Sequence, residues 1–310
     1  MSGYSPDVDV VVATRERPEL LRSCIRAIFD SDYAGAIRVI VVYDQSEPDE
    51  GLATEVELGL REGRSIHVTS NSRTPGLAGA RNTGLLTADA ELVAFCDDDD
   101  TWLPAKLARQ VAALDVSPTT ELISCGIEVE YDDHLTQRIL QQTEFTLTDL
   151  LRDRITELHP STFVMRRKAV VDGFGLVEEQ IPGSYAEDYE FLLRAARNQP
   201  VGNVPMVGVR VLWGSSFFTA RWTTIRQALT WLLEQYPEFA SVPAGEARVL
   251  GQIAFATASE GNRKGGAELA WRAIRTRPLE PRSYLALGVA SGLLKPDWVL
   301  RRLHAFGRGI

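Results

Sequence analysis

Short apolar runs alternate with helix-type patterns over the first hundred residues, and this alternation limits the possible folds more than any other feature. Apolar runs of strand length, rich in β-branched residues, lie at 8–13, 37–42, 65–69 and 91–96. Helical spacing of apolar residues fills the intervals at 18–29, 50–60 and 78–87. Strands that alternate with helices predict an α/β fold with a mainly parallel sheet flanked by helices.

Four consecutive aspartates at 97–100 directly follow the fourth apolar run. Adjacent carboxylates repel one another and raise each other's pKa values unless a cation neutralises them. A hard divalent ion, Mg²⁺ or Mn²⁺, suits this position because it takes oxygen ligands and also binds phosphates. The tetrad therefore predicts a metal–diphosphate site. A simpler explanation is an acidic turn in which Asp100 or Thr101 caps a helix that begins near Pro104.

The ends of the other strands favour the metal site. The polar segment 14–17 follows the first strand, and Asp44 follows the second. In parallel sheets, ligands bind beyond the carboxyl ends of the strands, so these groups and the tetrad should lie along one edge. A bound nucleotide diphosphate with its metal ion fits that edge.

The composition restricts the class of protein and its partners. The net charge of −9 disfavours a general nucleic-acid-binding protein. Cys24 and Cys96 lie inside apolar stretches, so we expect buried free thiols in a reducing compartment. The N-terminus has no signal-peptide pattern, and no segment approaches the roughly 20 apolar residues of a membrane span. These features predict a cytoplasmic protein.

The second half of the chain changes from mixed to helical patterns. Strand-type runs lie at 122–131, 162–165 and 204–211, and helix-type patterns at 145–153 and 187–198. Beyond residue 223 only helical patterns remain, and basic residues dominate after 263. The basic amphipathic segment 298–306 fits peripheral contact with an anionic membrane, but packing against its own domain or a partner subunit is the favoured interpretation.

Five segments in order along the chain resemble the family 2 glycosyltransferases, which have the GT-A fold. They are 10–18, 41–46, 79–84, the tetrad with Trp102 and Pro104, and 187–190, over about residues 8–222. The resemblance implies a nucleotide-sugar-binding half at 1–115, an acceptor-binding half at 116–235 and a helical extension at 236–310. It implies inverting transfer of a sugar from a nucleotide diphosphate to a glycan, lipid-linked or small-molecule acceptor.

The resemblance also implies roles for the donor-side residues. Asp97 and Asp99 would form the Asp-x-Asp element that binds Mn²⁺ or Mg²⁺, with Asp99 the direct ligand and Asp97 or Asp98 touching ribose or donor sugar. Asp44 would accept hydrogen bonds from the base or ribose, and Thr14 and Arg17 would line the base pocket. A strand-end cap and a solvated arginine are the alternatives for the last two.

Two arginines are candidates for contact with the nucleotide. Arg81 is similar in position to an arginine that the family uses there, and Arg73 lies in the loop 70–76, of a kind that often closes over substrates. A structural ion pair explains either arginine equally well.

The resemblance assigns the general base to Asp188, in a Glu-Asp pair at the start of a helix. Glu187 would raise the proton affinity of this pair, which suits a base. The alternative is that both carboxylates only favour the positive end of the helix dipole. His159 and Trp213 are weaker candidates for the acceptor site. The chain departs from the family at 210–213, where many members have a histidine that assists the metal.

Two other functions compete with this hypothesis. A nucleotidyltransferase also joins an α/β sheet to an acidic metal site, but it usually has a glycine-rich loop after the first strand, and the segment 14–18 contains no glycine. The second alternative is a glycosyltransferase-like protein that binds sugar nucleotides without turnover. The sequence leaves the oligomeric state open, a homo-oligomer included.

Overall fold

The computed structural model describes residues 5–53, 62–131, 134–212 and 221–305. The chain divides into two compact units. The first comprises 1–147, 155–179 and 187–214, and the second comprises 148–154, 180–186 and 215–310. We describe each unit by itself, and the functional division at 115/116 and 235/236 stays a prediction.

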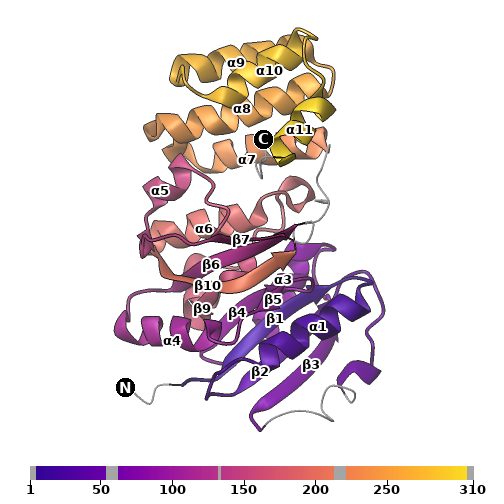
Figure 1. The fold of residues 1–310 in the computed structure, drawn as a ribbon, viewed down its shortest axis with the longest axis vertical. Helices are drawn as coiled ribbons and strands as arrows, with labels where there is room; N and C mark the ends of the chain where they lie inside the picture. Colours follow the sequence, from indigo (N-terminus) through magenta and orange to yellow (C-terminus); the bar gives the residue numbers. More distant parts are fainter. Residues whose placement is uncertain (1–4, 54–61, 132–133, 213–220, 306–310) are drawn as a thin grey trace. The chain divides into compact units, whose positions relative to one another are not determined.

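A mixed sheet forms the centre of the first unit, with its strands in the order β3-β2-β1-β4-β9-β6-β10-β5 (Figure 1). Its first four strands are all parallel, as the alternating pattern predicts. β9 pairs antiparallel with both β4 and β6, and β7 and β8 extend the sheet at β6 and β10. The strands are β1 (Val8–Thr14), β2 (Ile37–Tyr43), β3 (Arg64–Ser70), β4 (Leu92–Asp97), β5 (Thr101–Trp102), β6 (Leu122–Tyr131), β7 (His134–Arg138), β8 (Glu144–Phe145), β9 (Val164–Arg166) and β10 (Val201–Leu212).

Amphipathic helices pack on this sheet and complete its core. In α1, Leu21, Cys24, Ile25 and Ile28 are buried at helical spacing. They join the β-branched residues of β1 and β2 in one hydrophobic cluster. Burial of such side chains stabilises the unit by about 1.5–3 kcal/mol each. The helices of this unit are α1 (Pro18–Phe29), α3 (Leu77–Thr87), α4 (Lys106–Val116) and α6 (Glu187–Asn198).

Close approach of α3 explains the glycines in the segment 79–84. A Cβ on Gly84 would lie 2.2 Å from a methyl carbon of Val11, and one on Gly79 would collide with the backbone oxygen of Thr74. Only glycine lets the helix lie this near to β1 and to the preceding loop. The segment therefore serves packing in this structure.

The structure corrects two local predictions. Neither Asp100 nor Thr101 caps α4, which begins after Ala105 without a side-chain cap, because Thr101 belongs to β5 and Asp100 binds Ser161. The strand predicted at 162–165 runs from 164 to 166, since Pro160–Thr162 forms a short 3₁₀ turn. Of the helix predicted at 50–60, residues 51–53 are helical, and residues 54–61 lie outside the described part of the chain.

The second unit is helical, as the tail pattern predicts. Its helices are α5 (Leu147–Arg152, of which Leu147 belongs to the first unit), α7 (Trp222–Gln235), α8 (Pro243–Ser259), α9 (Arg263–Thr276), α10 (Pro281–Ala290) and α11 (Pro296–Ala305). The helix α8 packs against α7, α9 and α10 (Figure 1). Among the described residues, no helix combines the length and the apolar character needed to cross a membrane.

Candidate functional site

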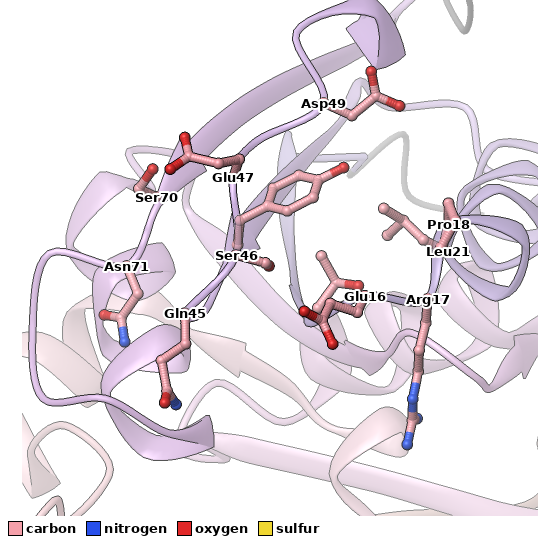
Figure 2. A pocket seen from close by; sticks show the side chains of 12 residues that line it. Glu16, Arg17, Pro18, Leu21, Gln45, Ser46, Glu47, Asp49, Ser70 and Asn71 are labelled. Carbon is pink, nitrogen blue, oxygen red and sulfur yellow. The ribbon is translucent and has the colours of Figure 1, made fainter.

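The parallel strands end beside a pocket of about 770 Å³. Thr14 and Tyr43 end β1 and β2 at the same level of the sheet, and Asp97 pairs with Ala13 on the other side of β1. Figure 2 shows Arg17 on one side of this pocket, and Gln45 and Asn71 on the other. The predicted edge of polar groups is therefore present, and it opens into a cavity large enough for a nucleoside.

Asp44 holds the loop that follows β3. Its carboxylate accepts hydrogen bonds from Asn71 Nδ2 at 2.8 Å, from the backbone nitrogen of Gly76 at 3.1 Å and from Gln45 Nε2 at 2.8 Å. Burial raises the pKa of Asp44, but these bonds outweigh it and the net pKa lies below the ordinary value. In this structure the protein's own donors occupy Asp44, so its predicted contact with a nucleotide stays a prediction.

Thr14 and Arg17 line the pocket and also bind the aspartate tetrad. The hydroxyl of Thr14 donates to Asp98 Oδ2 at 2.7 Å, and Arg17 Nη1 donates to Asp98 at 3.3 Å and to Asp99 at 2.8 Å. Burial, together with repulsion from neighbouring aspartates, holds the pKa values of Asp98 and Asp99 above normal despite Arg17. One exposed guanidinium thus compensates the tetrad only in part.

Arg81 joins the tetrad to the carboxylate pair Glu187–Asp188 through a buried group of three charges. Its Nη2 donates to Asp97 Oδ1 at 2.6 Å, and its Nη1 donates to Glu187 Oε1 at 3.0 Å. The arginine is only 3% exposed, and its guanidinium carbon lies 5.4 Å from the centre of the Phe95 ring. Of the two explanations for Arg81, the structure shows the ion pair; contact with a nucleotide stays a prediction.

The candidate catalytic pair stands at the first turn of α6. Glu187 is buried, and burial followed by the charge of Asp188 raises the pKa of Glu187 to about 7. Asp188 is partly exposed and lines a small hollow with Arg81, Pro160 and Phe191. Asp188 thus keeps part of its surface accessible to a substrate, and Glu187 binds Arg81.

His159 lies beside the tetrad. Its Nδ1 is 3.4 Å from Asp100 Oδ2, and Ser161 Oγ donates to the same carboxylate oxygen at 2.5 Å. The ligand atoms of Asp97, Asp100 and His159 all lie within 4.8 Å of one another. Burial is the main cause that raises the pKa of Asp100 to about 7. This group contains one of the two predicted metal ligands, Asp97, but not Asp99.

The roles predicted for the acceptor side stay untested. The contact of His159 with Asp100 neither supports nor excludes a contact with the acceptor. Trp213 falls outside the described residues.

A network around Glu179 was not predicted from the sequence. Its carboxylate accepts hydrogen bonds from Arg73 Nε at 2.5 Å, from Asn82 Nδ2 at 2.7 Å and from the hydroxyl of Thr74. The side-chain amide of Asn82 also donates to the backbone oxygen of Val177 and accepts from the backbone nitrogen of Val177. The predicted nucleotide contact of Arg73 thus remains a prediction, since here its side chain binds Glu179. The only sequence signal was the glutamate itself, about a hundred residues from its partners.

We expect Glu179→Gln to lower the free energy of unfolding by about 2 kcal/mol at pH 7, because hydrogen bonds to a charged group are lost or weakened. Burial opposes ionisation, yet the bonds from Thr74, Asn82 and Arg73 lower the pKa of Glu179 from 4.5 to about 2. This contribution is therefore present above pH 4.5 and is lost as the pH falls towards 2. Urea denaturation at several pH values measures it.

Glu144→Gln is the matched control, since Glu144 is exposed on β8 and should change stability little. Equal stability of the Glu179 variant and this control at pH 7 would contradict the importance of the network.

Comparison with known proteins places these residues in context. The model of Glycosyl transferase family 2 matches residues 9–174. The amylovoran biosynthesis glycosyltransferase AmsE of Erwinia amylovora is 27% identical over 218 residues, which cover 68% of this chain and 78% of AmsE.

Two solved structures share the fold. S. aureus TarS 1–349 in complex with UDP-GlcNAc superposes with a TM-score of 0.62 at 17% identity, covering 92% of this chain and 88% of TarS 1–349. The mannosyltransferase PcManGT of Pyrobaculum calidifontis, in complex with GDP-Man and Mn²⁺, gives a TM-score of 0.60 at 20% identity, covering 98% and 85%.

Proposed function

We propose that this chain, which belongs to glycosyl transferase family 2, transfers a sugar with inversion from a nucleoside diphosphate to an acceptor hydroxyl. The chain has the GT-A fold and is a glycosyltransferase that uses a nucleotide-sugar donor. The observation that most supports the proposed mechanism is the buried Arg81, which joins the tetrad to the Glu187–Asp188 pair. It links a candidate diphosphate site to a candidate base.

The donor would bind with its nucleoside in the pocket beyond β1, β2 and β3. Thr14 and Arg17 line that pocket and bind the tetrad, so the diphosphate of a bound donor would lie next to the aspartates. TarS 1–349 and PcManGT are complexes with UDP-GlcNAc and GDP-Man. We therefore propose a uridine or guanosine diphosphate sugar as donor.

The carboxylate groups of the tetrad are suitable ligands for a divalent cation. Carboxylate oxygens are the ligands that Mg²⁺ and Mn²⁺ prefer. Burial, and after it repulsion from neighbouring aspartates, raises the pKa values of Asp98 and Asp99 despite Arg17, and a bound cation would favour their ionised forms. We propose Asp97 and Asp99 as the protein ligands, because both carboxylates are partly exposed. A bound cation would offset the charge that develops on the leaving diphosphate.

Asp99→Asn should weaken Mn²⁺ binding at least about tenfold, because the proposed ligand loses its charge. Titration followed by the electron paramagnetic resonance of free Mn²⁺ measures this. His159→Ala is the comparison variant and should retain most of the affinity. Loss of Mn²⁺ binding in His159→Ala, with Asp99→Asn unaffected, would assign the metal to the Asp97–Asp100–His159 group instead.

Asp188 would act on the acceptor. Its carboxylate would take the proton of the acceptor hydroxyl while that oxygen bonds to the anomeric carbon, and the bond from that carbon to the diphosphate oxygen would break on the opposite face. Glu187 and Arg81 would hold the start of α6 against Asp97, so that base and leaving group keep their relative positions. Attack opposite the leaving group produces inversion.

A transfer assay with isotopically labelled donors tests the proposal. Purified protein, Mn²⁺ and each of several UDP- and GDP-sugars would be combined with a panel of glycan and glycolipid acceptors. NMR spectroscopy of the product should show an anomeric configuration opposite to that of the donor. A product that retains the configuration would contradict this mechanism. Donor binding without any transfer would favour the non-catalytic alternative, whereas the nucleotidyltransferase alternative has no support from the family match.

A further inference from the structure

The second unit carries a basic surface whose residues are not part of the candidate site. Residues 236–310 contain eleven Lys and Arg but only six Asp and Glu, although the whole chain has a net charge of −9. Much of this charge is exposed on α9, on α11 and on the turn before α11. The charge of this segment is thus opposite in sign to that of the whole chain.

Basic side chains gather where α10 leads into α11. The guanidinium of Arg263, at the start of α9, lies over Gly292, since a Cβ on that glycine would meet its Nη2 at 3.5 Å. Trp298 and Arg302 are four residues apart and therefore lie on one side of α11, and Lys295 directly precedes this helix. The guanidinium carbon of Arg302 lies 5.6 Å from the centre of the Trp298 ring.

Two large apolar side chains are exposed among these charges. Leu293 is 85% exposed on the turn, and Trp298 is 45% exposed. Their neighbours behave differently: Leu294 packs against the helical core, and Val299 is 2% exposed. The apolar face of α11 thus packs within its own unit, as the favoured interpretation of the sequence predicts. Leu293 and Trp298 lie outside that packing.

We propose that this surface docks on an anionic lipid membrane. We name it the α11 surface, and it consists of Arg263, Leu293, Lys295, Trp298, Arg301 and Arg302. Anionic headgroups attract the basic side chains, while an exposed leucine and a tryptophan suit the boundary between headgroups and acyl chains. Since the chain as a whole is acidic, an anionic membrane repels most of the remaining protein. The positive charge therefore favours contact through the second unit, and the exposed side chains of Leu293 and Trp298 favour the α11 surface within it.

Membrane docking deepens the proposed function, since it would bring the enzyme to lipid-linked acceptors. Its test does not depend on transfer. Protein without donor or acceptor would be sedimented with vesicles of phosphatidylcholine, alone or mixed with the anionic lipid phosphatidylglycerol. We expect binding to the mixed vesicles only, and weaker binding as salt is added. Arg301→Glu with Arg302→Glu should lower the partition onto mixed vesicles about tenfold or more, and Leu293→Ser should lower it to a smaller extent.

The matched control reverses the same number of charges at the other end of α9. Arg275→Glu with Arg277→Glu lies about 20 Å along the helix from Arg263 and should bind vesicles almost as the unchanged protein does. Loss of binding in this control equal to that in Arg301→Glu with Arg302→Glu would overturn the assignment to the α11 surface. If the unchanged protein stays in the supernatant in the presence of mixed vesicles, membrane docking itself is wrong. That result is expected if the α11 surface binds an acidic protein instead.

Discussion

Asp188→Asn should lower the rate of sugar transfer about a thousandfold, because a positioned general base typically accelerates a reaction by a factor of about a hundred to ten thousand. Asparagine has nearly the same shape as aspartate but cannot accept the acceptor's proton. Donor affinity should be retained, since Asp188 stands at α6 whereas the pocket lies beyond β1, β2 and β3. Single-turnover transfer, together with calorimetric titration of the nucleoside diphosphate, separates these two effects.

Asp172→Asn is the matched control for this variant. Asp172 is exposed and lies outside the candidate site, so the same chemical change there should leave both transfer and donor affinity close to normal. A turnover rate of Asp188→Asn within a few-fold of the unchanged protein would remove Asp188 as the base. The carboxylates at the start of α6 would then be explained by the helix dipole alone.

Arg81→Ala should destabilise the first unit by about 3–5 kcal/mol, because loss of one partner leaves buried charge without compensation. Asp97 and Glu187 would lose the guanidinium that lies between them. Chemical denaturation measures the change, and Mn²⁺ binding should weaken as well when Asp97 is no longer held. Arg226→Ala, which breaks the partly exposed pair with Glu260, should cost no more than about 1 kcal/mol.

A double substitution distinguishes charge imbalance from lost packing. Glu187→Gln removes one of the two carboxylates that Arg81 neutralises, so adding it to Arg81→Ala should recover part of the stability. If the double variant is as unstable as the sum of the two single variants, the role of Arg81 is packing against Phe95 rather than charge compensation.

The strands and their polar ends could be predicted from local patterns. The boundaries of β1, β2 and α6 follow from runs of β-branched residues and from helical spacing, and these depend on neighbours in the sequence. The placement of Thr14 and the tetrad at one edge follows from the rule for parallel strands. Such features need no knowledge of distant contacts.

Partners far apart in the sequence could not be predicted. Arg81 and Glu187 are 106 residues apart, and Asp100 and Ser161 are 61 apart. Each side chain is polar and suits several roles, so only the folded chain decides between a substrate contact and an ion pair. For the same reason Asp100, read from the sequence as a turn residue or helix cap, is a buried partner of Ser161 and His159.

Calorimetric titration of UDP and GDP, each with and without Mn²⁺, tests the central claim most directly. The claim is that the pocket beyond β1, β2 and β3 binds a nucleoside diphosphate whose phosphates meet a cation at the tetrad. We predict that at least one of the two binds with Mn²⁺ and loses about tenfold or more of its affinity without it. Failure of both to bind, or binding that is the same without the cation, would contradict the account.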